Sequence, residues 1–157
     1  MILQFKVKNF LSIREEQTLD FTASADKTYE DNAVVKIKGV RISKLGVVYG
    51  PNASGKSNIL KALAWFIFYL VASRSKKPGT GTGLTPFMMD EDSRNRNSSF
   101  ELIFYIGDVR YEYSVVLNNP RFIRKNCTSI PITAVRSFMS VPGMRTRAIL
   151  QFLLDHC

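Results

Sequence analysis

A glycine-bounded loop between two apolar segments constrains the fold of this chain more than any other feature. The loop is GPNASGKS at residues 50–57, preceded by LGVVY and followed by NILKALAWFIFYLVA. The first apolar segment predicts a buried strand, and the second predicts a helix that is buried on most sides. Glycines at both ends of the loop allow sharp turns and a close approach to a ligand. The pattern therefore predicts an α/β fold with a central strand, loop and helix.

The same unit has the parts that a phosphate-binding loop needs. The unpaired N–H groups at the start of the helix, together with those of the loop, would converge on phosphate oxygens. Lys56 would reach the β- and γ-phosphates, and the Ser57 hydroxyl would bind Mg²⁺. We therefore predict a nucleotide site, and the alternative is a glycine turn with an incidental lysine.

Alternation of apolar and polar residues predicts strands on both sides of this unit. Antiparallel strands are expected at 2–8 and 17–22, and a further strand at 34–37. A β-hairpin is expected at 100–106 and 110–117, with its turn at Gly107 and Asp108. A polar, glycine-rich surface loop should occupy 73–86. Beyond Asn119 the pattern is lost, so we predict an ATP-binding lobe at 1–118 and a C-terminal segment of irregular structure at 119–157.

Charge and cysteine content limit the classes of function. The formal net charge is +9, yet residues 119–157 hold six of the basic residues and only one acidic residue. This distribution favours a solvated basic tail, with nucleic-acid binding as the alternative. Cys127 and Cys157 lack metal-ligand spacing, and the apolar run of the central helix is shorter than the roughly 20 residues that span a bilayer. The N-terminus does not resemble a signal peptide. We therefore expect a cytoplasmic protein without a metal cluster or a membrane partner.

Three stretches resemble one group of ATPases. The loop GPNASGKSN closely resembles the Walker A motif of ATPase heads of SMC, RecF and ABC type. The N-terminal FKVKNFLSIREEQTLDF and the later TPFMMDEDSRNRNSSFELIFYIGDVRYEYSVVL resemble the AAA-type ATPases grouped with OLD proteins. This resemblance implies a P-loop lobe of ABC or SMC type that binds ATP with Mg²⁺.

The resemblance also assigns roles to individual residues. The triphosphate and Mg²⁺ would be held by the loop, with Asn58 at the start of the helix; the loop residues are Gly50, Pro51, Asn52, Ala53, Ser54, Gly55, Lys56 and Ser57. Lys8, Asn9 and Phe10 would lie near the adenine and ribose, although Phe10 could equally be a core aromatic residue. Arg14 could approach the phosphates, with an exposed loop arginine as the alternative.

Several parts of the resembling ATPases have no clear counterpart. Hydrolysis needs a carboxylate that holds Mg²⁺ and a residue that positions water, usually an Asp-Glu pair after an apolar strand. Asp155 is the nearest match, but His156 follows it, and a short C-terminal helix explains the segment better. The signature loop and the Q-loop glutamine are not found either, although Asp90 or Glu91 could take the place of the glutamine.

We therefore expect half of an ATP site, from a domain that naturally continues further. A second ATPase head or a complementary chain would be the partner that completes it. DNA is a further candidate partner, and the resemblance links such proteins to DNA transactions and phage defence.

Two alternatives from other classes are left open. One is a small stand-alone P-loop kinase, for which the arginines in RNR at 94–96 would form a lid; a GTPase is disfavoured because no Asn-Lys-x-Asp sequence is present. The other is a basic DNA-binding or adaptor module whose glycine loop is a remnant.

Overall fold

The computed structural model describes residues 1–72, 82–117, 122–130 and 136–137. Asp155 and most of the expected polar loop at 73–86 lie outside the described residues, so their predicted structures are not tested. The fold is mixed α/β, as expected, and its sheets are antiparallel.

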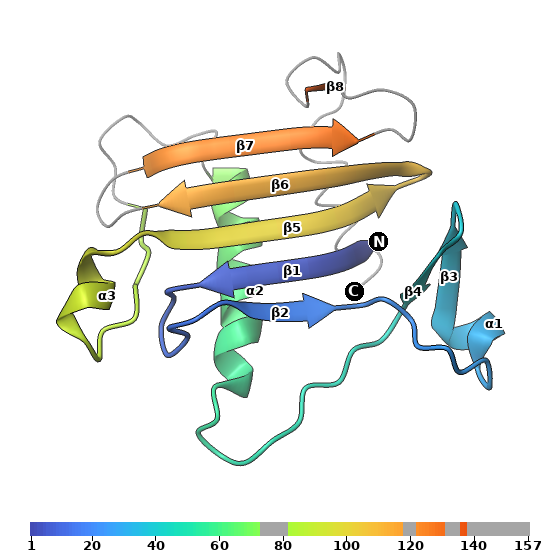
Figure 1. Ribbon diagram of the computed structural model, residues 1–157, viewed down its shortest axis with the longest axis horizontal. Helices are drawn as coiled ribbons and strands as arrows, with labels where there is room; N and C mark the ends of the chain where they lie inside the picture. Colours follow the sequence, from blue (N-terminus) through green and yellow to red (C-terminus); the bar gives the residue numbers. More distant parts are fainter. Residues whose placement is uncertain (73–81, 118–121, 131–135, 138–157) are drawn as a thin grey trace.

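A six-stranded antiparallel sheet forms the main layer, in the order β2-β1-β5-β6-β7-β8 (Figure 1). Its strands are β1 (Ile2–Lys8), β2 (Gln17–Asp20), β5 (Ser98–Ile106), β6 (Val109–Leu117), β7 (Phe122–Ile130) and β8 (Arg136–Ser137). Neighbouring strands in this order are antiparallel. The pairing of β1 with β5 joins segments that are nearly a hundred residues apart in the sequence. The N-terminal strand is therefore an interior strand of the sheet.

A smaller hairpin stands at one end of this sheet (Figure 1). It consists of β3 (Val34–Ile37) and β4 (Val40–Ser43), preceded by the short helix α1 (Glu30–Ala33). The turn between the strands places Lys38 and Gly39 at positive φ, which is the geometry of a tight two-residue hairpin turn. The expected strand at 34–37 is confirmed, and β4 is a strand that the sequence pattern did not predict.

The long helix α2 (Lys56–Ala72) crosses one face of the main sheet (Figure 1). Phe66 of this helix is fully buried, and its ring stacks on that of Phe100 from β5 at a centroid distance of 5.4 Å. Trp65 contacts Phe10 and Phe100 in the same layer. Aromatic burial between α2 and the sheet therefore forms the core and fixes the position of the helix start.

The structure corrects two predictions. The segment before the glycine loop, residues 45–49, forms no strand and is exposed, because no described strand lies alongside to pair with it. Residues 122–130 form β7 rather than irregular structure, because they pair with β6 beyond the boundary that we expected at 118, with one register shift between Val116 and Leu117. The strands at 2–8 and 17–22 and the hairpin at 100–117 are confirmed, with small shifts at their ends.

Candidate functional site

The glycine loop takes the sharply turned path that its sequence predicts. Gly50, Ala53 and Gly55 have φ values of 153°, 63° and 90°, in the region that favours glycine. A Cβ atom at Gly50 would lie 3.3 Å from the Ser54 Oγ, inside the curve of the loop. The loop then passes directly into α2, whose first residue is Lys56. A side chain at Gly50 would therefore crowd Ser54 within the loop.

The side chain of Lys56 folds back over this curve. Its ammonium donates hydrogen bonds to the carbonyl oxygens of Gly50 and Pro51, at 2.8 and 2.5 Å. Among the described residues, Lys56 forms no ion pair with a carboxylate. The loop thus places a cation beside exposed backbone at the N-terminus of a seventeen-residue helix, where the helix dipole also favours an anion.

The connection between β1 and β2 supports the loop from the sheet side. Asn58, in the first turn of α2, donates a hydrogen bond to the Ser12 Oγ at 2.7 Å. The same hydroxyl would lie 3.3 Å from a Cβ atom at Gly55. The sequence analysis did not identify Ser12; its only signal was its place in the segment NFLSIRE, which resembles the N-terminal segment of the ATPases. Gly55 is therefore needed both for its φ value and for this close contact.

Asn9 and Phe10, which we expected near the adenine and ribose, are buried in the fold. The Asn9 amide donates to the carbonyl oxygens of Ser93 and Arg96 at 2.9 and 3.0 Å, and accepts from the Phe87 N–H at 3.0 Å. Phe10 is only 3% exposed. These contacts favour the alternative of a core aromatic residue for Phe10, and a contact of either residue with a nucleotide stays a prediction.

Arg14 and Asp90 form an ion pair beside this connection. The Arg14 Nε lies 3.1 Å from Asp90 Oδ2, and Asp90 caps the short helix α3 (Glu91–Asn95) by accepting from the Ser93 N–H. This backbone hydrogen bond lowers the pKa of Asp90, with smaller contributions from the Ser93 hydroxyl and from Arg14. In this arrangement Asp90 has a structural role, and the roles predicted for Arg14, Asp90 and Glu91 toward phosphate or water are untested.

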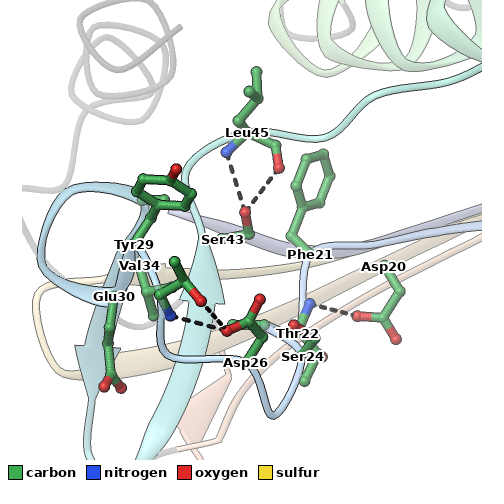
Figure 2. Close-up of a pocket in the computed structure, with 13 residues that line it drawn as sticks. Asp20, Phe21, Thr22, Ser24, Asp26, Tyr29, Glu30, Val34, Ser43 and Leu45 are labelled. Carbon is green, nitrogen blue, oxygen red and sulfur yellow. Dashed lines mark hydrogen bonds between the residues drawn. The ribbon is translucent and has the colours of Figure 1, made fainter.

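A separate open pocket of about 320 Å³ lies between the end of β2 and the β3-β4 hairpin. Asp26 accepts hydrogen bonds from the N–H and the hydroxyl of Thr28. Figure 2 shows that Asp20 accepts from the Thr22 N–H. Glu30 pairs with Arg41 at 2.9 Å. The acidic groups in this pocket are therefore already engaged, and none of the residues predicted to bind the nucleotide lines it.

Mg²⁺ would depend on Ser57 and on the phosphates themselves. Ser57 is exposed at the start of α2. Within the part of the chain that the structure describes, no three acidic, histidine or cysteine residues gather in a way that could hold a metal ion. No helix among the described residues has the length and apolar character needed to cross a membrane.

Comparison with known families decides the broad class. Residues 45–134 match the model of a family described as an AAA domain, putative AbiEii toxin, type IV TA system. The chain belongs to this family. The matched residues make up more than half of the chain. They include the whole glycine loop, α2 and the β5-β6 hairpin. None of the curated proteins compared with the chain matches it.

Membership confirms the expectation of an AAA-type P-loop ATPase. An AAA domain indicates nucleotide binding of the ATPase kind, usually with Mg²⁺. The glycine loop, α2 and the strands β5, β6 and β7 lie within the matched residues and are thus parts of an AAA domain. Membership by itself does not place the nucleotide on particular residues.

Proposed function

We propose that the chain binds Mg-ATP with residues 50–58, as the nucleotide-binding part of an ATPase of SMC, RecF or OLD type. The observation that carries the proposal is the position of the Lys56 ammonium over the curved backbone between Gly50 and Pro51. A phosphate placed at this point would meet the lysine, the loop N–H groups and the start of α2 together. Ser57, exposed beside them, is the proposed Mg²⁺ ligand.

Binding and hydrolysis are separable in this proposal. Hydrolysis needs a carboxylate on Mg²⁺ and a group that positions the attacking water. Asp90, which the sequence offered in place of the Q-loop glutamine, is held by Ser93 and Arg14. We therefore infer that a second ATPase head or a complementary chain supplies the missing groups, and that the chain alone releases little phosphate from ATP.

The family description supports a place in a toxin-antitoxin or phage-defence system, which agrees with the resemblance to OLD proteins. DNA is a secondary proposed partner, supported only by the net charge of +9. The alternatives of a stand-alone kinase and of a remnant loop make different predictions for nucleotide binding and turnover.

Thermal melting with and without nucleotide tests the proposal. At one hundred times its dissociation constant, a ligand that binds only the folded chain adds about 2.7 kcal/mol to stability. We expect Mg-ATP to raise the melting temperature of the wild-type chain, with a smaller rise for Mg-GTP. The substitution Lys56→Ala should abolish the rise, because it removes the only side-chain cation placed over the loop in the described structure.

The matched control is Lys61→Ala, which removes an exposed lysine from the same helix. This variant should keep the Mg-ATP response. A folded wild-type chain that shows no response to Mg-ATP would refute nucleotide binding and favour the remnant loop. Steady phosphate transfer from ATP to a small acceptor by the chain alone would favour the kinase.

A further inference from the structure

The connection between β1 and β2 begins with a tight turn whose backbone is strained. Phe10 and Ile13 exchange two backbone hydrogen bonds of 2.8 Å across the turn, which leaves Leu11 and Ser12 at its tip. Leu11 has a φ of 49°, a conformation that a bulky side chain rarely adopts and that persists only where its surroundings hold it. Strained residues of this kind cluster at functional sites, so the tip of the turn is a candidate for a role in the site that it contacts.

Buried contacts hold this turn in place. Its two outer residues, Phe10 and Ile13, are buried and belong to the hydrophobic core. The Leu11 N–H donates a hydrogen bond to the Thr85 carbonyl oxygen at 3.0 Å. Of the four turn residues, only Ser12 is exposed. The turn is therefore a support fixed to the sheet, and Ser12 is the residue that it presents outward.

Ser12 meets the junction between the glycine loop and α2 at two points. Its Oγ accepts a hydrogen bond from the Asn58 side-chain amide at 2.7 Å, and would lie 3.3 Å from a Cβ atom at Gly55. The Asn58 N–H donates in turn to the Gly55 carbonyl oxygen at 2.9 Å. The three residues thus form a closed set of contacts at the start of α2, and Ser12 is the member that belongs to the sheet.

This junction sets the direction of N–H groups that have no acceptor. Within the described residues, the backbone N–H groups of Gly55, Lys56 and Ser57 donate no hydrogen bond, as is usual at the start of a helix. Their directions follow from the tilt of the first turn of α2, which the hydrogen bond between Asn58 and Ser12 ties to the sheet. Such donors bind phosphate oxygens when they converge on one point. Without this hydrogen bond the same donors would be present, but their directions would be less well fixed.

We propose that Ser12 is a positioning residue for phosphate binding, which acts through Asn58 on the N–H groups at the start of α2. Ser12 does not touch the nucleotide in this role. The role rests on the proposed function, because it assumes that residues 50–58 hold the phosphates. It adds that the turn after β1, a part of the sheet, helps to determine the affinity of the loop.

Calorimetric titration of the full chain with two ligands tests this role. Mg-ATP and Mg-tripolyphosphate share the phosphate chain, but tripolyphosphate lacks adenine and ribose. Ser12→Ala removes the acceptor of one hydrogen bond, so the affinity for each ligand should fall about fivefold. Because Ser12 is exposed, the melting temperature without ligand should stay close to that of the wild type. A residue that only supports the fold would lower the melting temperature and leave the affinity of the folded chain unchanged.

A double-mutant cycle checks that Ser12 acts through Asn58. Asn58→Ala should weaken the binding of both ligands, and adding Ser12→Ala to it should cause no further loss. Ser12→Thr keeps the hydroxyl and should retain most of the affinity. The matched control is Thr28→Val, which removes an exposed hydroxyl that donates to Asp26 in the separate pocket. This variant should bind both ligands as the wild type does.

The outcomes separate this role from the proposed function. A folded wild-type chain that binds neither ligand would refute the proposed function, and the role of Ser12 with it. Wild-type binding together with unchanged affinity in Ser12→Ala would overturn only the role of Ser12. A loss with Mg-ATP but not with Mg-tripolyphosphate would place Ser12 against the nucleoside instead. Additive losses in the double mutant, or equal losses in Ser12→Thr and Ser12→Ala, would show that Ser12 does not act through its hydrogen bond with Asn58.

Discussion

The buried amide of Asn9 donates a hydrogen bond to the carbonyl oxygen of Ser93 at 2.9 Å, joining the end of β1 to α3. The backbone of Asn9 has a φ of 55°, and its carbonyl oxygen accepts a hydrogen bond from the Ser98 hydroxyl at the start of β5. The side chain and the backbone of Asn9 thus connect β1 with α3 and with β5.

Replacing Asn9 should destabilise the fold strongly. Asn9→Ala leaves buried N–H and C=O groups without partners and places Ala at positive φ, so we expect a loss of roughly 2–4 kcal/mol. Asn9→Asp should cost at least as much, because a carboxylate would face the carbonyl oxygens of Ser93 and Arg96. Urea unfolding measures both variants. A loss below about 1 kcal/mol for both would contradict the central role of Asn9.

Two phenylalanines on the same helix should respond differently to truncation. Phe66 is fully buried against Phe5 and Phe100, so Phe66→Ala should reduce the free energy of unfolding by about 3–5 kcal/mol. Phe68 is 65% exposed, so Phe68→Ala should change it by less than about 0.5 kcal/mol. Denaturant titration of the two variants checks this difference. Equal losses would mean that the outward face of α2 is covered in solution.

Substitution of a loop glycine should weaken Mg-ATP binding more than it lowers the stability of the fold. Gly50→Ala places a Cβ atom 3.3 Å from the Ser54 Oγ and forces a non-glycine residue to a φ of 153°. We expect Mg-ATP affinity to fall at least about tenfold, with a smaller effect on melting without nucleotide. Gly107→Ala is a control for φ strain alone, since its φ is 54° in a distant hairpin turn. Retained affinity in Gly50→Ala would place the nucleotide elsewhere.

Stability should fall in acid through carboxylates that the fold holds ionised. The pKa of Asp90 is lowered by the Ser93 N–H, and that of Asp20 is lowered by the Thr22 hydroxyl and N–H. Because each folded pKa lies below the ordinary 3.8, the stabilisation is complete above that pH and is lost as pH falls through the folded pKa.

We therefore expect the free energy of unfolding to be nearly constant from about pH 5 to 7 and to decrease below about pH 4. Asp90→Asn keeps a residue that can cap α3 but removes the titrating group, so its decrease should be shallower. Urea unfolding at a series of pH values provides the test. An acid slope identical to that of the wild type would show that Asp90 contributes nothing to it.

Local patterns predicted β1, the β5-β6 hairpin and α2, because each has a clear alternation or a long apolar run. The hairpin at β5 and β6 is fixed by period two and by the Gly107 turn. β4 was missed because Val40–Ser43 is too short to show a period, and β7 because its pairing with β6 is a tertiary contact. Residues 45–49 have the composition of a buried strand, but composition does not show whether a neighbouring strand pairs with them.

For the candidate site, the sequence indicated the loop and its chemistry but not its supports. The roles predicted for Gly50, Lys56 and Ser57 follow from a spacing that is typical of phosphate-binding loops. Ser12 could not be identified in this way, since a single serine in a short loop carries no periodic signal. The buried environment of Asn9 likewise depends on residues more than eighty positions away.

The hydrogen bonds of Lys56 to its own loop have a consequence for ligand exchange. The carbonyl oxygens of Gly50 and Pro51 act as an internal ligand for the ammonium, so an incoming anion competes with the protein itself. Measured affinity would then be reduced by the fraction of chains in which the lysine is still engaged. The same internal ligand would recapture the lysine when the anion leaves, so release needs no solvent ion to replace it.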